Sequence, residues 1–504
     1  MGEKRFFGHP MGLSTIFFTE MWERFSYYGM RALLVLFLTA SVTSGGFGLD
    51  REVAYTIYGI FTFLVYVTPM IGGVLADKVL GLRSTIYIGA ISMAVGQFML
   101  AFAAIANDNM ALRELWFYSG LGLLIIGNGL FKPTISTIVG SLYENNDPRK
   151  EGGFTIFYMS VNIGAFFSPL IAGALGENVS WEWGYFVSGV GMVISVAWFI
   201  IKSESTLGSL GLPLKADSSR RALNLADWRV IALSTLGIII SVPLSIMVWG
   251  VVPGYLQSII IYTVASVGGL YLVASIIRGV ESREQWARVA VILILAFFNI
   301  FFWVGFEQAG TTFNMFALEN TNRELFGWEI PASWFQSINA IFIVVLAPLF
   351  SMMWVALGRV KLNPKTPFKF MWGMLLLSLG AAVIAIADGI SNGGDEIVKV
   401  SPMWLTMVYL IFTIGELFIS PIGLSMITKL APPKLISTLM GLWMFSFAAG
   451  NFGASQAERL SRSVEVAIGQ PVNVFWFVSA ITAIATLCLL ILSPWLSRMM
   501  KGVN

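Results

Sequence analysis

The chain of 504 residues is 57% hydrophobic and 12% charged, about half the charged share of a soluble protein. Its net charge of +3 is too small to indicate nucleic-acid binding, and one cysteine and one histidine exclude disulfide frameworks and histidine–cysteine metal clusters. With 17 tryptophans and 39 phenylalanines, this composition indicates a polytopic membrane protein that lies in a lipid bilayer.

Apolar runs long enough to cross a bilayer recur along the whole chain, since a spanning helix needs about 20 mostly apolar residues. The seventh and eighth runs are separated only by residues 250–252, which predicts a tight helical hairpin. The fourteen predicted spans are residues 14–41, 53–77, 84–105, 113–142, 153–176, 183–201, 229–249, 253–277, 289–318, 332–357, 368–388, 402–428, 435–457 and 472–497.

The distribution of lysine and arginine predicts how these spans are oriented, because cytoplasmic loops are enriched in both. With the N-terminus in the cytoplasm, 22 of the 31 basic residues fall on the cytoplasmic side, six fall outside and three lie within spans. This bias supports the number of spans and predicts that the N- and C-termini are both cytoplasmic.

The segment 202–229 is polar and rich in Ser, Gly and Pro, which is typical of a linker, and residues 278–288 form a second charged stretch. Leaving out the hairpin between them gives six helices plus six, the plan of a major facilitator transporter. We therefore predict an all-α membrane protein with an N-terminal bundle at 1–203, a linker and inserted hairpin at 204–283, and a C-terminal bundle at 284–504. No extramembrane segment is long enough for a soluble enzyme domain.

Seven ionisable residues fall within the predicted spans, where a charge is costly and usually faces a water-filled cavity or a partner. On the first span the charged side chains, with Tyr27 and Tyr28, share one helical face about 140 degrees wide, opposite an apolar face of packing or lipid contacts. A purely structural set of buried ion pairs is the alternative to a functional site. The seven residues are Glu20, Glu23, Arg24, Arg31, Lys132, Glu307 and Glu416.

The signs of these charges divide between the two predicted bundles. All three bases belong to the first bundle, and the second contributes only Glu307 and Glu416. This division suits a zwitterionic substrate, with its carboxylate toward Arg31 and Lys132 and its ammonium toward Glu416. Since the spans contain no histidine, carboxylates are the plausible proton carriers, and a proton is the only coupling ion that we expect.

Several motifs resemble those of the proton-dependent oligopeptide transporter family of the major facilitator superfamily. Residues 20–28, EMWERFSYY, match the family pattern ExxERFxYY, and residues 157–164, FYMSVNIG, resemble FYxxxNxG. Residues 72–81 resemble the loop signature after the second helix, and Glu307-Gln308, Gly415-Glu416 and Ser420-Pro421 also fit. The inserted hairpin is similar to the extra helix pair of bacterial members, which implies a bacterial inner membrane.

The resemblance implies symport of di- and tripeptides with protons by alternating access, and it implies roles for individual residues. Arg31 would bind the carboxyl end of the peptide and pair with Glu307 when the outer gate closes. The proton-coupling set would be Glu20, Glu23, Arg24, Lys132 and Glu307. The further peptide-binding residues would be Tyr27, Tyr66, Lys132, Tyr158, Asn162, Trp303, Asn339, Glu416, Ser420 and Trp443.

Other functions remain open from the sequence. One alternative is a transporter of nitrate or another small solute, which would leave Glu416 without an obvious task. Another is a peptide receptor that signals without transport, but this chain shows no obvious signalling domain. A channel is disfavoured by the unequal charges of the two bundles. An enzyme is disfavoured because no nucleophile, metal site or cofactor motif accompanies the paired carboxylates. The sequence leaves the oligomeric state open.

Overall fold

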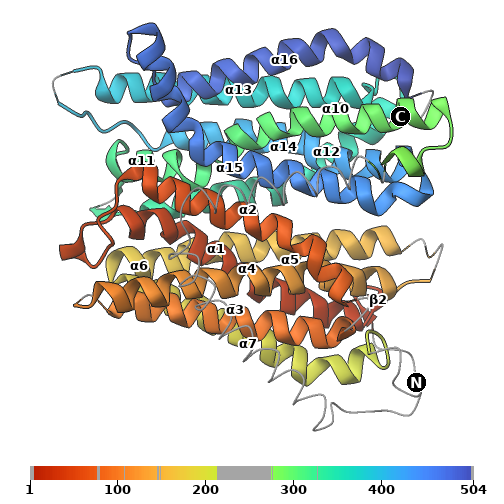
Figure 1. Cartoon of the computed structure of the whole chain (residues 1–504), viewed down its shortest axis with the longest axis horizontal. Coiled ribbons are helices and arrows are strands. Elements are labelled where there is room, and N and C mark those ends of the chain that lie inside the picture. The colour runs from red at the N-terminus through yellow and green to blue at the C-terminus, as the bar shows by residue number, and fades with distance from the viewer. Residues whose placement is uncertain are drawn as a thin grey trace. The chain divides into compact units, whose positions relative to one another are not determined.

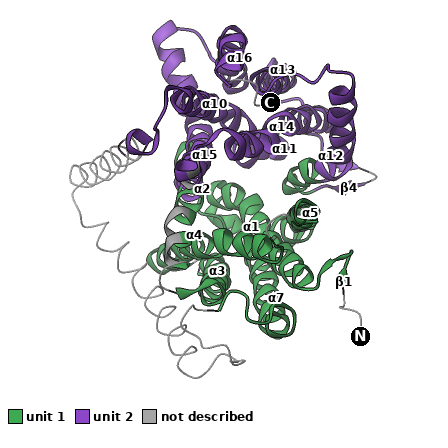
Figure 2. Cartoon of the chain, turned by 90° about the vertical axis from the view of Figure 1, so that its right-hand side faces the viewer, with its two compact units in different colours: residues 1–54, 64–248, 331–340 green, residues 55–63, 249–330, 341–504 purple. Residues whose placement is uncertain are grey.

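The computed structural model describes residues 5–500 except 77–79, 107, 145–146, 148, 213–273, 275, 326 and 395. The predicted span 229–249 and most of the span 253–277 lie outside the described residues, as does most of the linker. The described part is almost entirely helical (Figure 1). It forms two compact units, coloured separately in Figure 2.

Unit 1 comprises residues 1–54, 64–248 and 331–340. A small antiparallel pair, β1 (Arg5–Phe6) and β2 (His9–Pro10), precedes its helices. The helix pair α3 and α4 runs side by side (Figure 1), and α1 packs mainly against α5 and α7. Its long helices are α1 (Gly12–Thr39), α2 (Arg51–Leu75, with residues 55–63 grouped in unit 2), α3 (Leu82–Ile105), α4 (Met110–Ser141), α5 (Lys150–Ser168) and α7 (Trp181–Leu207).

Helix α1 is buried on nearly all sides. Side chains from three neighbouring helices donate hydrogen bonds to its backbone. Gln97 of α3 donates a 3.1 Å hydrogen bond to the Ser26 carbonyl, and Ser195 of α7 donates a 2.7 Å bond to the Thr19 carbonyl. Ser168 of α5 donates to the Phe25 carbonyl. Interhelical bonds of this kind hold membrane helices together. The apolar face predicted for this helix therefore meets other helices, as the burial of Phe25 confirms.

Two predicted spans are interrupted helices. The span 153–176 divides into α5, a π-helical turn η3 (Pro169–Gly173) and α6 (Ala174–Asn178), because Pro169 has no backbone N–H to donate. The span 289–318 divides into α10 (Arg283–Phe306), the 3-10 turn η4 (Glu307–Gly310) and α11 (Thr312–Glu319). The second break places Glu307 at the end of a helix instead of within one.

Unit 2 comprises residues 55–63, 249–330 and 341–504. In it α13 packs against α14 and α16, and α10 packs against α15. A short hairpin, β3 (Glu324–Leu325) with β4 (Trp328–Glu329), follows α11, and η5 (Ala332–Phe335) of unit 1 leads into the next helix. The later elements are α12 (Gln336–Arg359), α13 (Thr366–Asn392), α14 (Met403–Leu430), η6 (Pro433–Leu435), α15 (Ile436–Ile468) and α16 (Val474–Met499).

Among the described residues, nine helical segments are long and apolar enough to cross a membrane. Helix α1 is not one of the nine, since its four charges leave no sufficiently uncharged stretch. The chain is therefore a multi-pass helical membrane protein. The domain boundaries at 203 and 283 stay predictions.

Candidate functional site

The centre of the candidate site in unit 1 is an arginine between two carboxylates on α1. The Arg24 Nε atom lies 3.1 Å from Glu20 Oε1, and it also binds Glu23 Oε2. A second bond of 2.9 Å joins Arg24 Nη2 to Glu23 Oε1. All three side chains are buried, so charges that the helical spacing placed on one face pair inside the protein.

The two carboxylates are not equally satisfied. Glu23 accepts from Arg24 through both oxygens and also from Asn128 Nδ2 of α4 at 3.4 Å. The buried Glu20 Oε2 has no hydrogen-bond partner among the described residues. A buried oxygen without a donor is costly while the carboxylate is charged. Sequence reasoning missed Asn128, whose only signal was the GNG pattern at 127–129.

Lys132 lies one turn further along α4 from Asn128. Its ammonium is 4.5 Å from the centroid of the Tyr66 ring, a cation–π arrangement, and it lies within electrostatic range of Glu20. Unit 1 therefore brings both predicted proton-coupling cations, Arg24 and Lys132, near Glu20.

A glycine lets α5 approach this cluster closely. A Cβ atom added at Gly164 would overlap the Met21 carbonyl oxygen and lie 2.8 Å from Arg24 Cβ. The last residue of the FYMSVNIG signature thus contacts the backbone of the EMWERFSYY motif. This contact gives a physical reason for a glycine at this point of α5.

The remaining predicted residues of unit 1 lie on three elements. Arg31 and Tyr27 are buried on α1, where the Arg31 guanidinium lies 5.8 Å from the Tyr28 ring centroid. On α5, Tyr158 is 48% exposed, and Asn162 donates a 3.0 Å bond to the Tyr158 carbonyl within its own helix. Asn339 is half-buried near the start of α12.

In unit 2, Glu307 is buried and begins the turn that interrupts the span. The next residue fixes this turn. Gln308 donates to the Val304 carbonyl at 3.0 Å and to the Ala454 carbonyl of α15 at 3.2 Å, and it accepts from Thr312 at 2.7 Å. Gln308 therefore positions Glu307, a role that its place in the sequence motif did not reveal.

Glu416 is buried on α14, and Ser420 lies one turn later. The Ser420 hydroxyl is buried and has no hydrogen-bond partner in the described part of the chain. Trp303 packs against Phe447 with ring centroids 4.5 Å apart, and Trp443 is 0% exposed and packs against Phe370. The two indole N–H groups are likewise unpaired within the described ranges.

Each unit therefore has its own chemistry. Unit 1 has buried cations with two carboxylates that share one arginine, and unit 2 has two buried carboxylates with indole and hydroxyl donors. The described residues contain no group of three His, Cys, Asp or Glu side chains that could hold a metal ion. The arrangement can bind charged ends of a small molecule and exchange protons.

Known sequences resemble this chain over most of its length. The sequence model of the POT family matches residues 83–474. The peptide transporter YePEPT of Yersinia enterocolitica subsp. palearctica is 40% identical over 460 residues, which cover 90% of this chain and 88% of the relative. The dipeptide and tripeptide permease B of Photorhabdus asymbiotica is 31% identical over 504 residues, which cover 98% of this chain and 97% of the relative.

Solved structures of POT transporters share the fold over nearly the whole chain. A crystal structure of peptide transporter POT in complex with sulfate superposes with a TM-score of 0.81 at 34% identity and covers 100% of this chain and 98% of that chain. A POT family transporter in complex with 5-aminolevulinic acid gives a TM-score of 0.81 at 31% identity and covers 98% of this chain and 99% of that chain.

Proposed function

Because the chain belongs to the POT family of membrane transporters, as its motifs predicted, we propose that it imports di- and tripeptides together with protons by alternating access. The family is one of transporters and not of enzymes. The names of the relatives support the substrate class, since YePEPT is a peptide transporter and the Photorhabdus protein is a dipeptide and tripeptide permease.

The observation that carries the coupling proposal is the sharing of Arg24 by Glu20 and Glu23. Glu23 is satisfied by Arg24 and Asn128, whereas one oxygen of Glu20 accepts no bond from the described residues. A proton added to Glu20 removes a buried charge without breaking the Arg24–Glu23 pair. Glu20 is therefore the proton carrier in our proposal, and Glu23 keeps Arg24 in place.

The substrate end groups match the charges of the two units. In the proposal, Arg31 and Lys132 bind the peptide carboxylate and Glu416 binds its ammonium, with the tyrosines and asparagines of unit 1 along the peptide. Trp303, Ser420 and Trp443 receive peptide side chains through their unpaired indole and hydroxyl groups. Charge-assisted hydrogen bonds of this kind are stronger than neutral ones, so a peptide with both ends charged binds best.

The proposed arrangement in the membrane is that of a bacterial inner-membrane major facilitator with 14 spans, two six-helix bundles plus the inserted pair. Both termini face the cytoplasm, because the loops on that side carry 22 basic residues and the opposite loops carry six. The pairing of Arg31 with Glu307 at a closed outer gate is part of the same proposal.

The test is uptake of labelled dialanine into proteoliposomes, with and without an inward proton gradient, for the native chain and for Glu20→Gln. We expect the native chain to concentrate dialanine only with the gradient. Glu20→Gln should lose concentrative uptake but keep exchange of labelled for unlabelled dialanine, because the peptide-binding residues are intact.

The controls separate the coupling proposal from the substrate proposal. Native protein that concentrates labelled nitrate but not dialanine would overturn peptide transport. Glu20→Gln protein that still concentrates dialanine as well as the native chain would overturn the role of Glu20 while leaving peptide transport intact.

A further inference from the structure

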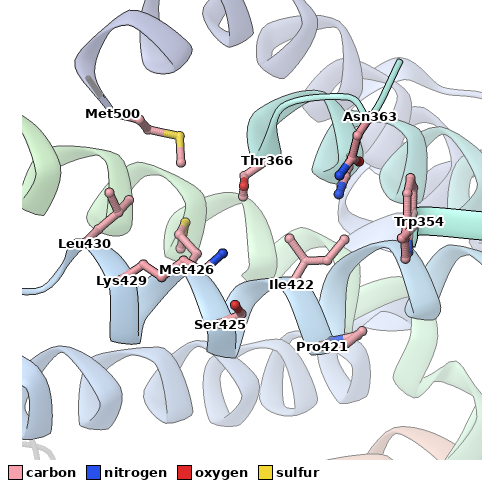
Figure 3. A pocket seen from close by; sticks show the side chains of 11 residues that line it. Trp354, Asn363, Thr366, Pro421, Ile422, Ser425, Met426, Lys429, Leu430 and Met500 are labelled. Carbon is pink, nitrogen blue, oxygen red and sulfur yellow. The ribbon is translucent and has the colours of Figure 1, made fainter. Parts of the chain in front are cut away.

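Unit 2 contains a pocket along the last ten residues of α14, which follow Ser420. The pocket has a volume of about 290 Å³ and lies among the end of α12, the start of α13 and the end of α14. In Figure 3, Thr366 and Asn363 face one side of α14, and Met500 closes one end. The α14 residues that line this side are Pro421, Ile422, Ser425, Met426, Lys429 and Leu430. The volume is at the lower limit of small-molecule pockets, about 300–1,000 Å³, and suits a compact head group.

The lining of the pocket is cationic. Lys369 and Lys429 line it, and none of the described residues that line it is acidic. Lys369 is held in place by an aromatic ring, since its ammonium lies 4.1 Å from the centroid of Trp354. A ring covers only one side of an ammonium group, which has three N–H donors, so Lys369 can also bind an anion.

Neutral donors in the same pocket favour an anion with several oxygens. Thr366 and Ser425 contribute hydroxyl groups, and Asn363 contributes an amide. Two ammonium groups with such donors match a phosphate group, which accepts several charge-assisted hydrogen bonds at once.

The surrounding sequence adds further positive charge. Residues 359–369 and 429–434 carry six lysine and arginine side chains and no acidic side chain. Of these six, Lys434 pairs with Glu281 at 2.5 Å. Basic pockets of this kind at helix ends attract the head groups of anionic lipids.

Two leucines next to lining residues in the sequence are exposed on the surface. Leu362 is 70% exposed and Leu424 is 39% exposed, and each precedes a lining residue, Asn363 or Ser425, in the sequence. Exposed leucines at such positions suit contact with acyl chains. We propose that this pocket, with Lys369 and Lys429 as its anion-binding residues, binds a phosphate-bearing anion, and that the phosphate is the head group of an anionic phospholipid. The proposal is independent of the transported substrate.

The test titrates the purified full chain in neutral detergent with phosphatidylglycerol or with phosphatidylcholine of the same acyl chains, and counts bound lipid by native mass spectrometry. We expect the native chain to prefer phosphatidylglycerol by about tenfold or more, as two basic residues at a membrane surface imply. Lys369→Gln/Lys429→Gln should lose the preference, and Lys369→Arg/Lys429→Arg should keep it.

A matched control removes the same charge near the pocket but outside its lining. Lys361→Gln/Lys365→Gln should keep the preference, since neither residue lines the pocket. Equal loss in the control pair and the pocket pair would overturn the proposal, because general surface charge would then explain the binding. If the double variant does not fold, the single variant Lys429→Gln at an exposed position provides the same comparison.

Inorganic phosphate distinguishes the two sources of the anion. Phosphate at millimolar concentration should leave bound phosphatidylglycerol in place if the lipid is the natural occupant. Displacement of phosphatidylglycerol from the native chain by free phosphate would overturn the lipid assignment. Equal binding of phosphatidylglycerol and phosphatidylcholine by the native chain would overturn the whole proposal.

Discussion

The Glu177 carboxylate accepts a 2.9 Å hydrogen bond from the backbone amide of Ser333, and its other oxygen accepts a 2.7 Å bond from Ala332. One side chain of α6 thus satisfies two consecutive amides at the start of η5, more than 150 residues later in the chain. Trp334 and Ser337 donate to the carbonyls of Leu170 and Phe166, so the same segments are joined at several points.

Glu177→Gln should destabilise unit 1, because an amide has one acceptor oxygen and cannot cap both backbone groups. The expected loss is about 1 kcal/mol, similar to the loss of a helix N-cap. The thermal unfolding midpoint of the purified protein measures it. Glu182→Gln on α7 is the matched control with the same charge change, and it should unfold like the native chain. Equal midpoints for both variants would show that the Glu177 bonds do not stabilise unit 1.

Gly164→Ala should impair both stability and transport. The added Cβ would overlap the Met21 carbonyl oxygen and push α5 away from Arg24, at a cost of about 1–3 kcal/mol. Proton-driven dialanine uptake should fall, because the ion pairs of α1 would shift. Unfolding midpoints and proteoliposome uptake measure the two effects.

The control for this substitution is Gly389→Ala on α13, where an added Cβ meets no atom within 4 Å. This variant should be as stable as the native chain or slightly more stable, because alanine favours a helix over glycine. A Gly164→Ala protein that matches Gly389→Ala in midpoint and uptake would contradict the close-contact explanation.

The sequence predicted the charged face of α1 because residues three and four apart on a helix share a face, and this rule is local. It could not predict that Asn128 binds Glu23, since the partners are 105 residues apart and only packing brings them together. It also missed the break at Glu307, although residues 307–314 (EQAGTTFN) are mostly polar, because the apolar residues on either side make 289–318 long enough to be taken as one span. The bonds that replace the helical ones come from the Gln308 side chain to a distant helix.

Arg149→Gln should raise the pKa of Asp147 from about 2 toward the ordinary carboxyl value, because it removes the Arg149 side-chain hydrogen bonds, the largest cause of the lowering, and keeps only the backbone bond. A lowered carboxyl pKa stabilises the folded state above the ordinary carboxyl pKa, and the effect is lost as the pH falls through about 2. Carboxyl chemical shifts of labelled aspartate during an acid titration measure the pKa. The control is Lys150→Gln, which removes the neighbouring cation and should leave the pKa of Asp147 at about 2. An equal rise of this pKa in both variants would show that nearby positive charge, and not the Arg149 hydrogen bonds, lowers it.

Gln308→Leu should be among the more harmful single changes in unit 2. Leucine fills similar space but makes no hydrogen bond to the buried Ala454 carbonyl or the Thr312 hydroxyl. The unsatisfied buried groups should cost about 2 kcal/mol or more of the free energy of unfolding. The turn that holds Glu307 should loosen, so both the unfolding midpoint and proton-driven uptake should fall.

Gln336→Leu provides the matched control, since the Gln336 amide nitrogen is buried and has no hydrogen-bond partner within the described chain. The substitution at Gln336 breaks no bond from that nitrogen, so it should lower the unfolding midpoint less than Gln308→Leu does. If the two leucine variants have the same unfolding midpoint and the same uptake, Gln308 does not fix the turn. A larger loss in Gln308→Leu, partly recovered in Gln308→Asn, would show that its amide group and not its volume holds Glu307 in position.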